Sequence, residues 1–135
     1  MLSPSSVTIR VFLHVIAASV WVGGQFVVAG IVPAVRRTSP QTTKVIAQAF
    51  GRVAWPAFGI TVLTGMWNLM AVDITASTSS YQGTVLFHLA LAIASGVFAA
   101  VHTVGKSKAA LAVGGALGAL TAVAAMFVGV LLRTA

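Results

Sequence analysis

Three histidines are the residues of this chain best suited to bind a metal, because neutral imidazole nitrogen is the commonest metal ligand in proteins. They are His14, His88 and His102, and the chain contains no cysteine. Asp73 is the only acidic side chain. Catalysis by paired carboxylates, carboxylate cages for calcium or magnesium, and di-iron carboxylate sites are therefore excluded within one chain. The sequence offers no catalytic residue and does not point to an enzyme.

The histidines lie within long apolar segments. Hydrophobic residues make up 59% of the 135 residues and charged residues only 7%, against about 25% charged in soluble proteins. Four apolar runs exceed the ~20 helical residues that cross a bilayer, and a short polar turn is expected over residues 38–43. The pattern predicts an all-α integral membrane protein, an antiparallel up-down four-helix bundle forming one domain over 1–135. The predicted spans are roughly 7–35, 50–72, 82–104 and 109–132.

The basic residues predict the orientation of these spans. Arg10 and Arg133 lie at one set of ends, and six bases lie at the other, namely Arg36, Arg37, Lys44, Arg52, Lys106 and Lys108. Because the more basic side faces the cytoplasm, both termini are expected outside, in a multi-pass protein of the bacterial inner (cytoplasmic) membrane. The same rule accounts for the net charge of +7, so nucleic acid is not expected as a partner. The expected partner is the lipid bilayer.

Each predicted span carries one stripe of small and polar residues, which membrane helices turn toward each other. The stripes recur at intervals of three and four residues, the spacing of one helical face. In the fourth span the stripe is a groove of small residues, interpreted as close packing. The four stripes are His14, Ala18, Trp21 and Gln25; Ala57, Thr61, Thr64 and Asn68; His88, Ala92, Ser95, Ala99 and His102; and Gly114, Gly118, Ala122, Ala125 and Gly129.

Two of the histidines are expected at a similar depth. His14 lies one helical turn inside Arg10, and His88 lies two turns inside Tyr81, at ~1.5 Å per residue. Asn68 is expected at the same level, so the three side chains are predicted to form one polar layer in the outer half of the membrane. His14 and His88 are therefore the predicted metal ligands, with Asn68 as an auxiliary that fixes a tautomer. His102, at the opposite end, is interpreted as a packing residue.

Copper and haem b both fit such a pair of histidines. Copper suits imidazole with thioether, and Met126 is the thioether expected to reach inward, with Trp21 and Gln25 as further auxiliaries. The alternative is a haem-b-binding membrane electron carrier or oxidoreductase, in which both histidines are axial ligands and the propionates meet Arg10 and Arg133. The small residues would then make room for the macrocycle. A third hypothesis is a structural subunit of a membrane complex or a homo-oligomer, in which the histidines only form hydrogen bonds.

Two segments resemble a known family. Leu13–Gly24 contains Leu-His, a run of small residues and then Trp-x-Gly-Gly. Phe50–Trp55 and Leu63–Asn68 contain Phe-x-Arg and Leu-Thr-Gly-x-x-Asn. These stretches resemble the CopD copper-resistance domain, and the likeness extends over nearly the whole chain. More distantly, the chain is similar to the HemJ-type haem-binding proteins.

The resemblance implies a polytopic inner-membrane protein that acts in copper uptake or tolerance. It carries over to six positions, His14, Trp21, Gly23, Gly24, Gly65 and Asn68. The chain departs from the family at His88, where many relatives place a lysine. Histidine instead of lysine turns a cationic site into a second metal ligand, so the resemblance and the residues together favour copper bound by His14 and His88.

Overall fold

The computed structural model describes residues 3–134, which fold into four helices and no strand. The helices are α1 (Ser6–Thr38), α2 (Pro40–Met70), α3 (Ser79–Val104) and α4 (Lys108–Thr134). All four are long and apolar enough to cross a membrane. The predicted all-α class with four membrane-length helices is thus confirmed, and the chain is a multi-pass membrane protein.

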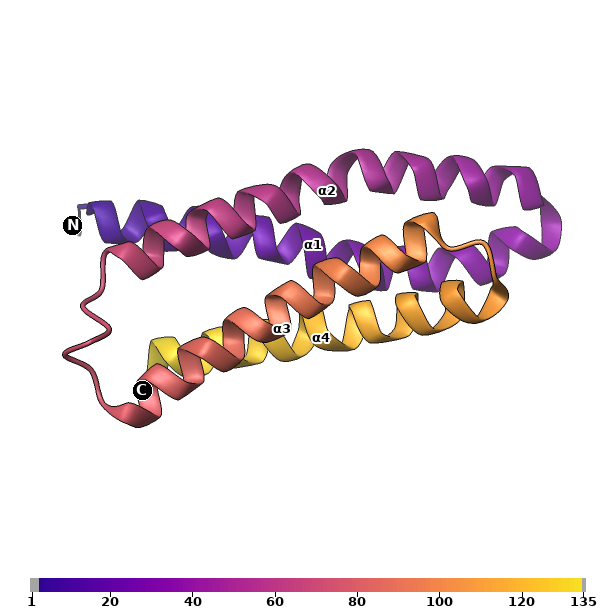
Figure 1. Ribbon diagram of the computed structural model, residues 1–135. Helices are drawn as coiled ribbons and strands as arrows, with labels where there is room; N and C mark the ends of the chain where they lie inside the picture. The colour runs from indigo at the N-terminus through magenta and orange to yellow at the C-terminus, as the bar shows by residue number, and fades with distance from the viewer. Residues whose placement is uncertain (1–2, 135) are drawn as a thin grey trace. The chain divides into compact units, whose positions relative to one another are not determined.

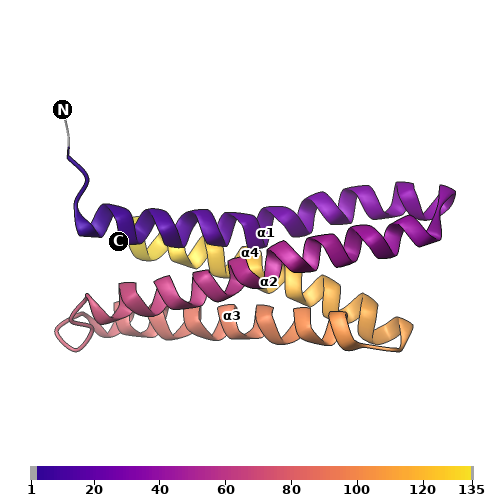
Figure 2. The same ribbon diagram turned by 90° about the horizontal axis from the view of Figure 1, so that it is seen from above.

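The chain divides into two compact units, one ending at Val72 and the other beginning at Asp73. In each unit two helices run antiparallel and side by side, α1 with α2 and α3 with α4, as both views show (Figures 1 and 2). We call these the α1–α2 hairpin and the α3–α4 hairpin. The prediction of a single domain and of one bundle concerns both hairpins together and stays a prediction.

The connection within the α1–α2 hairpin is much shorter than the predicted polar turn over 38–43. Ser39 alone separates the two helices, and its backbone N–H donates to the Val35 carbonyl at 2.8 Å to end α1. Its hydroxyl also accepts from the backbone N–H of Thr42, and Pro40 occupies the first helical position. A serine cap followed by proline starts a helix efficiently. Residues 40–49, predicted to precede the second span, are therefore helical.

The other helix ends follow the same chemistry. Ser5 caps α1 through a capping box with Thr8, and Thr78 caps α3 by accepting from the Tyr81 N–H. Between α3 and α4, a Cβ at Gly105 would lie 2.6 Å from the Val101 carbonyl, so only glycine fits this connection. Side-chain caps and a glycine connection therefore determine these helix ends.

The two hairpins pack by different means. In the α1–α2 hairpin the buried Trp21 of α1 contacts Phe58 and Trp55 of α2, with ring centroids 4.6 and 5.5 Å apart. In the α3–α4 hairpin the predicted small-residue groove is buried instead. A Cβ at Gly114 would lie 2.8 Å from the His102 backbone nitrogen and 2.9 Å from the Phe98 carbonyl oxygen. The groove thus accepts the backbone of α3, as its interpretation as close packing predicted.

Candidate metal-ligating histidines

His14 lies half-buried on the face of α1 that packs against α2. Its Nδ1 is 3.0 Å from the Thr61 carbonyl oxygen and 3.1 Å from the Thr64 hydroxyl oxygen. The carbonyl can only accept, and the Thr64 hydroxyl donates to the Ile60 carbonyl at 2.6 Å, so Nδ1 carries the proton. In the neutral ring, Nε2 then holds the lone pair that a metal would use.

His88 repeats this arrangement in the α3–α4 hairpin. Its ring is half-buried, and Nδ1 donates to the Ala125 carbonyl at 2.9 Å. This bond again fixes the Nδ1–H tautomer, with the lone pair on Nε2. Asn68 was predicted to fix the tautomer of one of these rings. That assignment is wrong at Nδ1, where backbone carbonyls hold both rings.

A glycine faces each ring four residues after the carbonyl that the ring binds. A Cβ at Gly65 would lie 3.2 Å from Cε1 of His14, and one at Gly129 would lie 3.1 Å from Cε1 of His88. Such distances are tighter than nine in ten real Cβ contacts. These glycines therefore make room for the two imidazole rings.

His102 shows the same construction at the other end of the α3–α4 hairpin. Its Nδ1 donates to the Leu111 carbonyl at 2.6 Å, and a Cβ at Gly115 would lie 3.0 Å from that nitrogen. The side chain is exposed, unlike those of His14 and His88. A hydrogen bond to a helical carbonyl is what a packing histidine makes, as predicted for His102, and also what a metal ligand makes with its other ring nitrogen.

Ser95 completes a ladder along the α3–α4 hairpin. Its hydroxyl donates to the Gly118 carbonyl at 3.1 Å, midway between the bonds of His88 and His102. The three donors on α3 are spaced by seven residues, and so are the three acceptor carbonyls on α4. Seven residues are two helical turns, the interval at which the same face of one helix meets its packed neighbour again. We call this set of hydrogen bonds the carbonyl ladder.

Arg10 and Asn68 form the neighbouring contact in the α1–α2 hairpin. Arg10 lies one helical turn before His14, and its Nε donates to Asn68 Oδ1 at 2.7 Å. Both side chains are half-buried. Asn68 was predicted as an auxiliary at the level of His14 and His88, and the partner that it has in the structure is Arg10.

The remaining predicted auxiliaries are placed as follows. Trp21 belongs to the aromatic core of its hairpin, and the amide nitrogen of Gln25 donates to the Trp21 carbonyl at 3.1 Å. Met126 is half-buried on α4, next in sequence to the residue whose carbonyl holds His88. Arg133 is exposed in the last turn of α4. Trp21 and Gln25 therefore take part in packing within the α1–α2 hairpin. Of these auxiliaries, Met126 alone adjoins in sequence a residue that binds a histidine ring.

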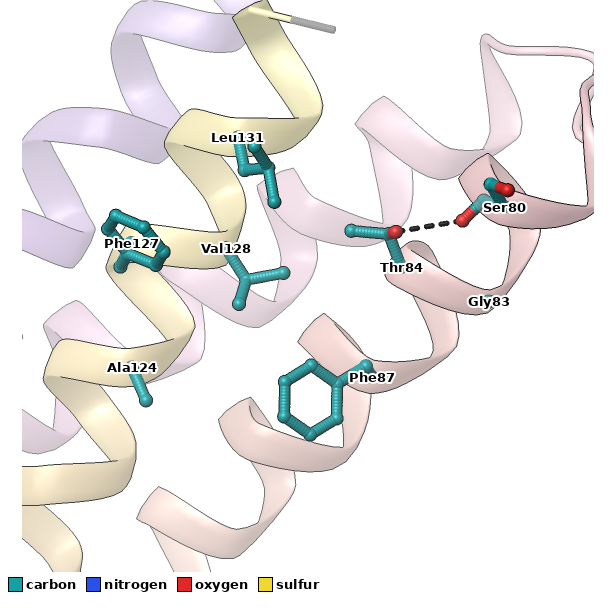
Figure 3. A pocket seen from close by; sticks show the side chains of 8 residues that line it. All are labelled: Ser80, Gly83, Thr84, Phe87, Ala124, Phe127, Val128 and Leu131. Carbon is teal, nitrogen blue, oxygen red and sulfur yellow. Dashed lines mark hydrogen bonds between the residues drawn. The ribbon is translucent and has the colours of Figure 1, made fainter.

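A hollow of about 510 Å³ opens between α3 and α4 (Figure 3). Its walls are mostly apolar, and the hydroxyl of Thr84 at its rim donates to the Ser80 carbonyl at 2.8 Å. Nothing in this wall could act as an acid, a base or a metal ligand. The lining residues are Ser80, Gly83, Thr84, Phe87, Ala124, Phe127, Val128 and Leu131. The histidines, not this hollow, are the chemically capable groups.

Within residues 3–134 no group of three or more His, Cys, Asp or Glu side chains could together hold a metal ion. No family model, curated protein or solved structure matches the chain. The resemblance to the CopD domain stays a prediction from the residues that carry it.

Sequence reasoning found the histidines and missed the groups that hold them. Nδ1 of each ring donates to a backbone carbonyl, and a carbonyl has no residue-type signature. A usable signal was nevertheless present, because each ring needs a glycine on the facing helix. Gly65, Gly115 and Gly129 were visible as glycines within apolar helices, and in an antiparallel hairpin each could have been matched with one histidine.

Proposed function

We propose that the protein handles copper in a bacterial inner membrane, in uptake or tolerance, with His14 and His88 as ligands. One observation carries the proposal. Both rings donate from Nδ1 to a helical carbonyl at 3.0 and 2.9 Å, which assigns the lone pair of the neutral ring to Nε2. Metal-bound histidines usually have this outer hydrogen bond.

The ligand chemistry of the chain supports copper over other metals. The chain has no cysteine and no carboxylate within its helices, so imidazole and thioether are its ligands for a soft ion. This set suits Cu(I). Met126, half-buried beside Ala125 in sequence, is the thioether that we assign to the same site as His88.

Haem b is the alternative cofactor for the same two histidines, with Arg10 as a propionate contact. The packing of the glycines favours copper over it. Gly65 and Gly129 are filled by the imidazoles themselves, and Gly114 and Gly118 are filled by α3. The small residues that would have accommodated a macrocycle are therefore already in contact with protein atoms.

Titration of the purified protein with Cu(I) tests the proposal, and an optical spectrum of the same sample tests the alternative. We expect saturable copper binding that His14→Ala or His88→Ala abolishes. His102→Ala is the matched control, because it removes a ring held by the same kind of hydrogen bond, and it should leave binding nearly intact.

Equal copper loading by His88→Ala and the unsubstituted protein would refute the proposal and make the histidines packing residues. A Soret band in the purified protein would replace copper with haem. The number of copper ions bound per chain tests the prediction that the two histidines share one ion. A shared ion is lost completely when either ring is removed.

A further inference from the structure

Arg10 is an unusual residue for its position. It is the fifth residue of α1, it is half-buried, and its guanidinium turns toward α2 rather than away from the hairpin. Charged side chains inside membrane segments are costly, and they usually mark a functional contact. No ion pair of Arg10 occurs among residues 3–134. The only carboxylate side chain, that of Asp73, accepts hydrogen bonds from Thr75 and Ala76 within its own turn.

The contact with Asn68 fixes the direction of the guanidinium. Because Nε can only donate, the amide oxygen of Asn68 must accept, and this settles which end of the amide points toward Arg10. The bond of 2.7 Å is short, as charge-assisted hydrogen bonds are. The hydrogen bond to Asn68 therefore holds the planar guanidinium of Arg10 in one orientation.

The groups that remain on the pair are almost entirely hydrogen-bond donors. The guanidinium keeps its two terminal NH₂ groups, and the Asn68 amide keeps one. In the described part of the chain, neither set donates to a side chain or a carbonyl. A ligand that complements two such donor groups, one of them cationic and forked, must present acceptor oxygens and negative charge.

We propose that Arg10, oriented by Asn68, forms an oxyanion-binding site at the open end of the α1–α2 hairpin. Its ligand is a phosphate or carboxylate group, supplied by an anionic lipid headgroup or by a soluble anion. The site lies one turn before His14 on α1, and Asn68 lies one turn after Thr64 on α2. The anion is thus bound one helical turn from the His14 imidazole. The site does not depend on which metal that imidazole binds.

The test uses the full chain without added metal, in two arms. In neutral detergent, inorganic phosphate is titrated and followed by calorimetry. In nanodiscs of phosphatidylcholine with phosphatidylglycerol, the anionic lipid retained after detergent extraction is counted by native mass spectrometry. Binding in the first arm identifies a soluble oxyanion, and retention in the second alone identifies a lipid headgroup. Either result supports the site, provided that Arg10→Gln removes it.

Matched variants separate this site from general attraction to a basic protein. Arg37→Gln removes an exposed arginine in the last turn of α1 and should leave binding unchanged. Asn68→Ala keeps the charge of Arg10 and releases the guanidinium, so it should weaken binding about tenfold, the factor for one charge-assisted hydrogen bond. If Arg10→Gln fails to fold, Arg10→Lys keeps a cation but loses Nε and the fork, and it should also weaken binding.

Three results would overturn the proposal. The first is no binding of phosphate and no retained anionic lipid by the unsubstituted protein. The second is equal weakening by Arg10→Gln and Arg37→Gln, which would show attraction by net charge alone. The third is unchanged binding in Asn68→Ala, which would show that the hydrogen bond from Arg10 to Asn68 does not contribute to the site. None of these results bears on copper binding, so the proposed function is judged separately.

Discussion

Replacement of Gly114 by alanine tests the packing of the α3–α4 hairpin most directly. The added Cβ would lie 2.8 Å from the His102 backbone nitrogen and 2.9 Å from the Phe98 carbonyl oxygen. Both atoms belong to the backbone of α3, so no side chain can rotate away. Ordinary contact begins at 3.4 Å, and the helices must therefore separate locally by about 0.6 Å.

The expected cost follows from two opposing effects. Overpacking of a well-packed contact costs about 1–3 kcal/mol, whereas alanine in place of glycine favours the helix by up to about 1 kcal/mol. Overpacking dominates because the obstacle is backbone. We expect the free energy of unfolding of Gly114→Ala to fall by about 1–2 kcal/mol, through overpacking that also lengthens the nearby bond from His102 to Leu111.

Unfolding in mixed micelles of a mild detergent and dodecyl sulfate, followed by circular dichroism, measures this difference. Gly83→Ala is the matched control in the same hairpin, because nothing lies within 4 Å of its added Cβ. It should be neutral or slightly stabilising. If Gly114→Ala were as stable as Gly83→Ala, the close approach of α3 and α4 would be refuted.

Three further predictions concern other parts of the chain. Trp21→Ala removes the centre of the aromatic core and should lower the free energy of unfolding by about 3–5 kcal/mol, whereas Trp21→Phe should lower it much less; equal effects in the same unfolding assay would contradict the ring contacts. A reporter fused after the C-terminus should be active on the outer side of the membrane, because six bases lie at the opposite ends of the spans; a cytoplasmic signal would reverse the orientation. The hydrogen bonds from the Thr75 hydroxyl and the Ala76 amide hold the pKa of Asp73 below its usual range. A lowered carboxyl pKa stabilises the turn above the unfolded value of about 3.9, and this stability is lost as pH falls through the folded value. The amide resonance of Thr75 should therefore stay constant from pH 7 to pH 5 and shift only below about pH 4.

The apolar helices were predictable because their signal is repeated over many residues. The interior stripes were predictable for the same reason, and Trp21, Thr64, Ser95 and Gly118 are all buried. The joint at Ser39 was not predicted, because a polar segment resembles a loop unless its first two residues are recognised as a cap and a helix start. The first span was predicted to end near residue 35, yet α1 continues through Pro33 to Thr38.

The candidate site was predictable only in part. The histidines could be selected by residue type and expected depth, whereas Asn68 was predicted at the level of His14 and His88 and its contact with Arg10 was not predicted. The choice of partner for each ring did not follow, because any carbonyl on the facing helix could have accepted. Register between the helices decides that choice, and register depends on the packing of the glycines.

The carbonyl ladder also restricts how the α3–α4 hairpin can move. Sliding α3 along α4 by one turn would break the hydrogen bonds of His88, Ser95 and His102 together, and each glycine would lose the ring or backbone that it accommodates. Small sliding of packed helices is one of the ways in which proteins change shape, and hinge motion is another. The ladder opposes the first. The α3–α4 hairpin is therefore expected to move as one rigid element, because sliding cannot break one bond of the carbonyl ladder without breaking the other two.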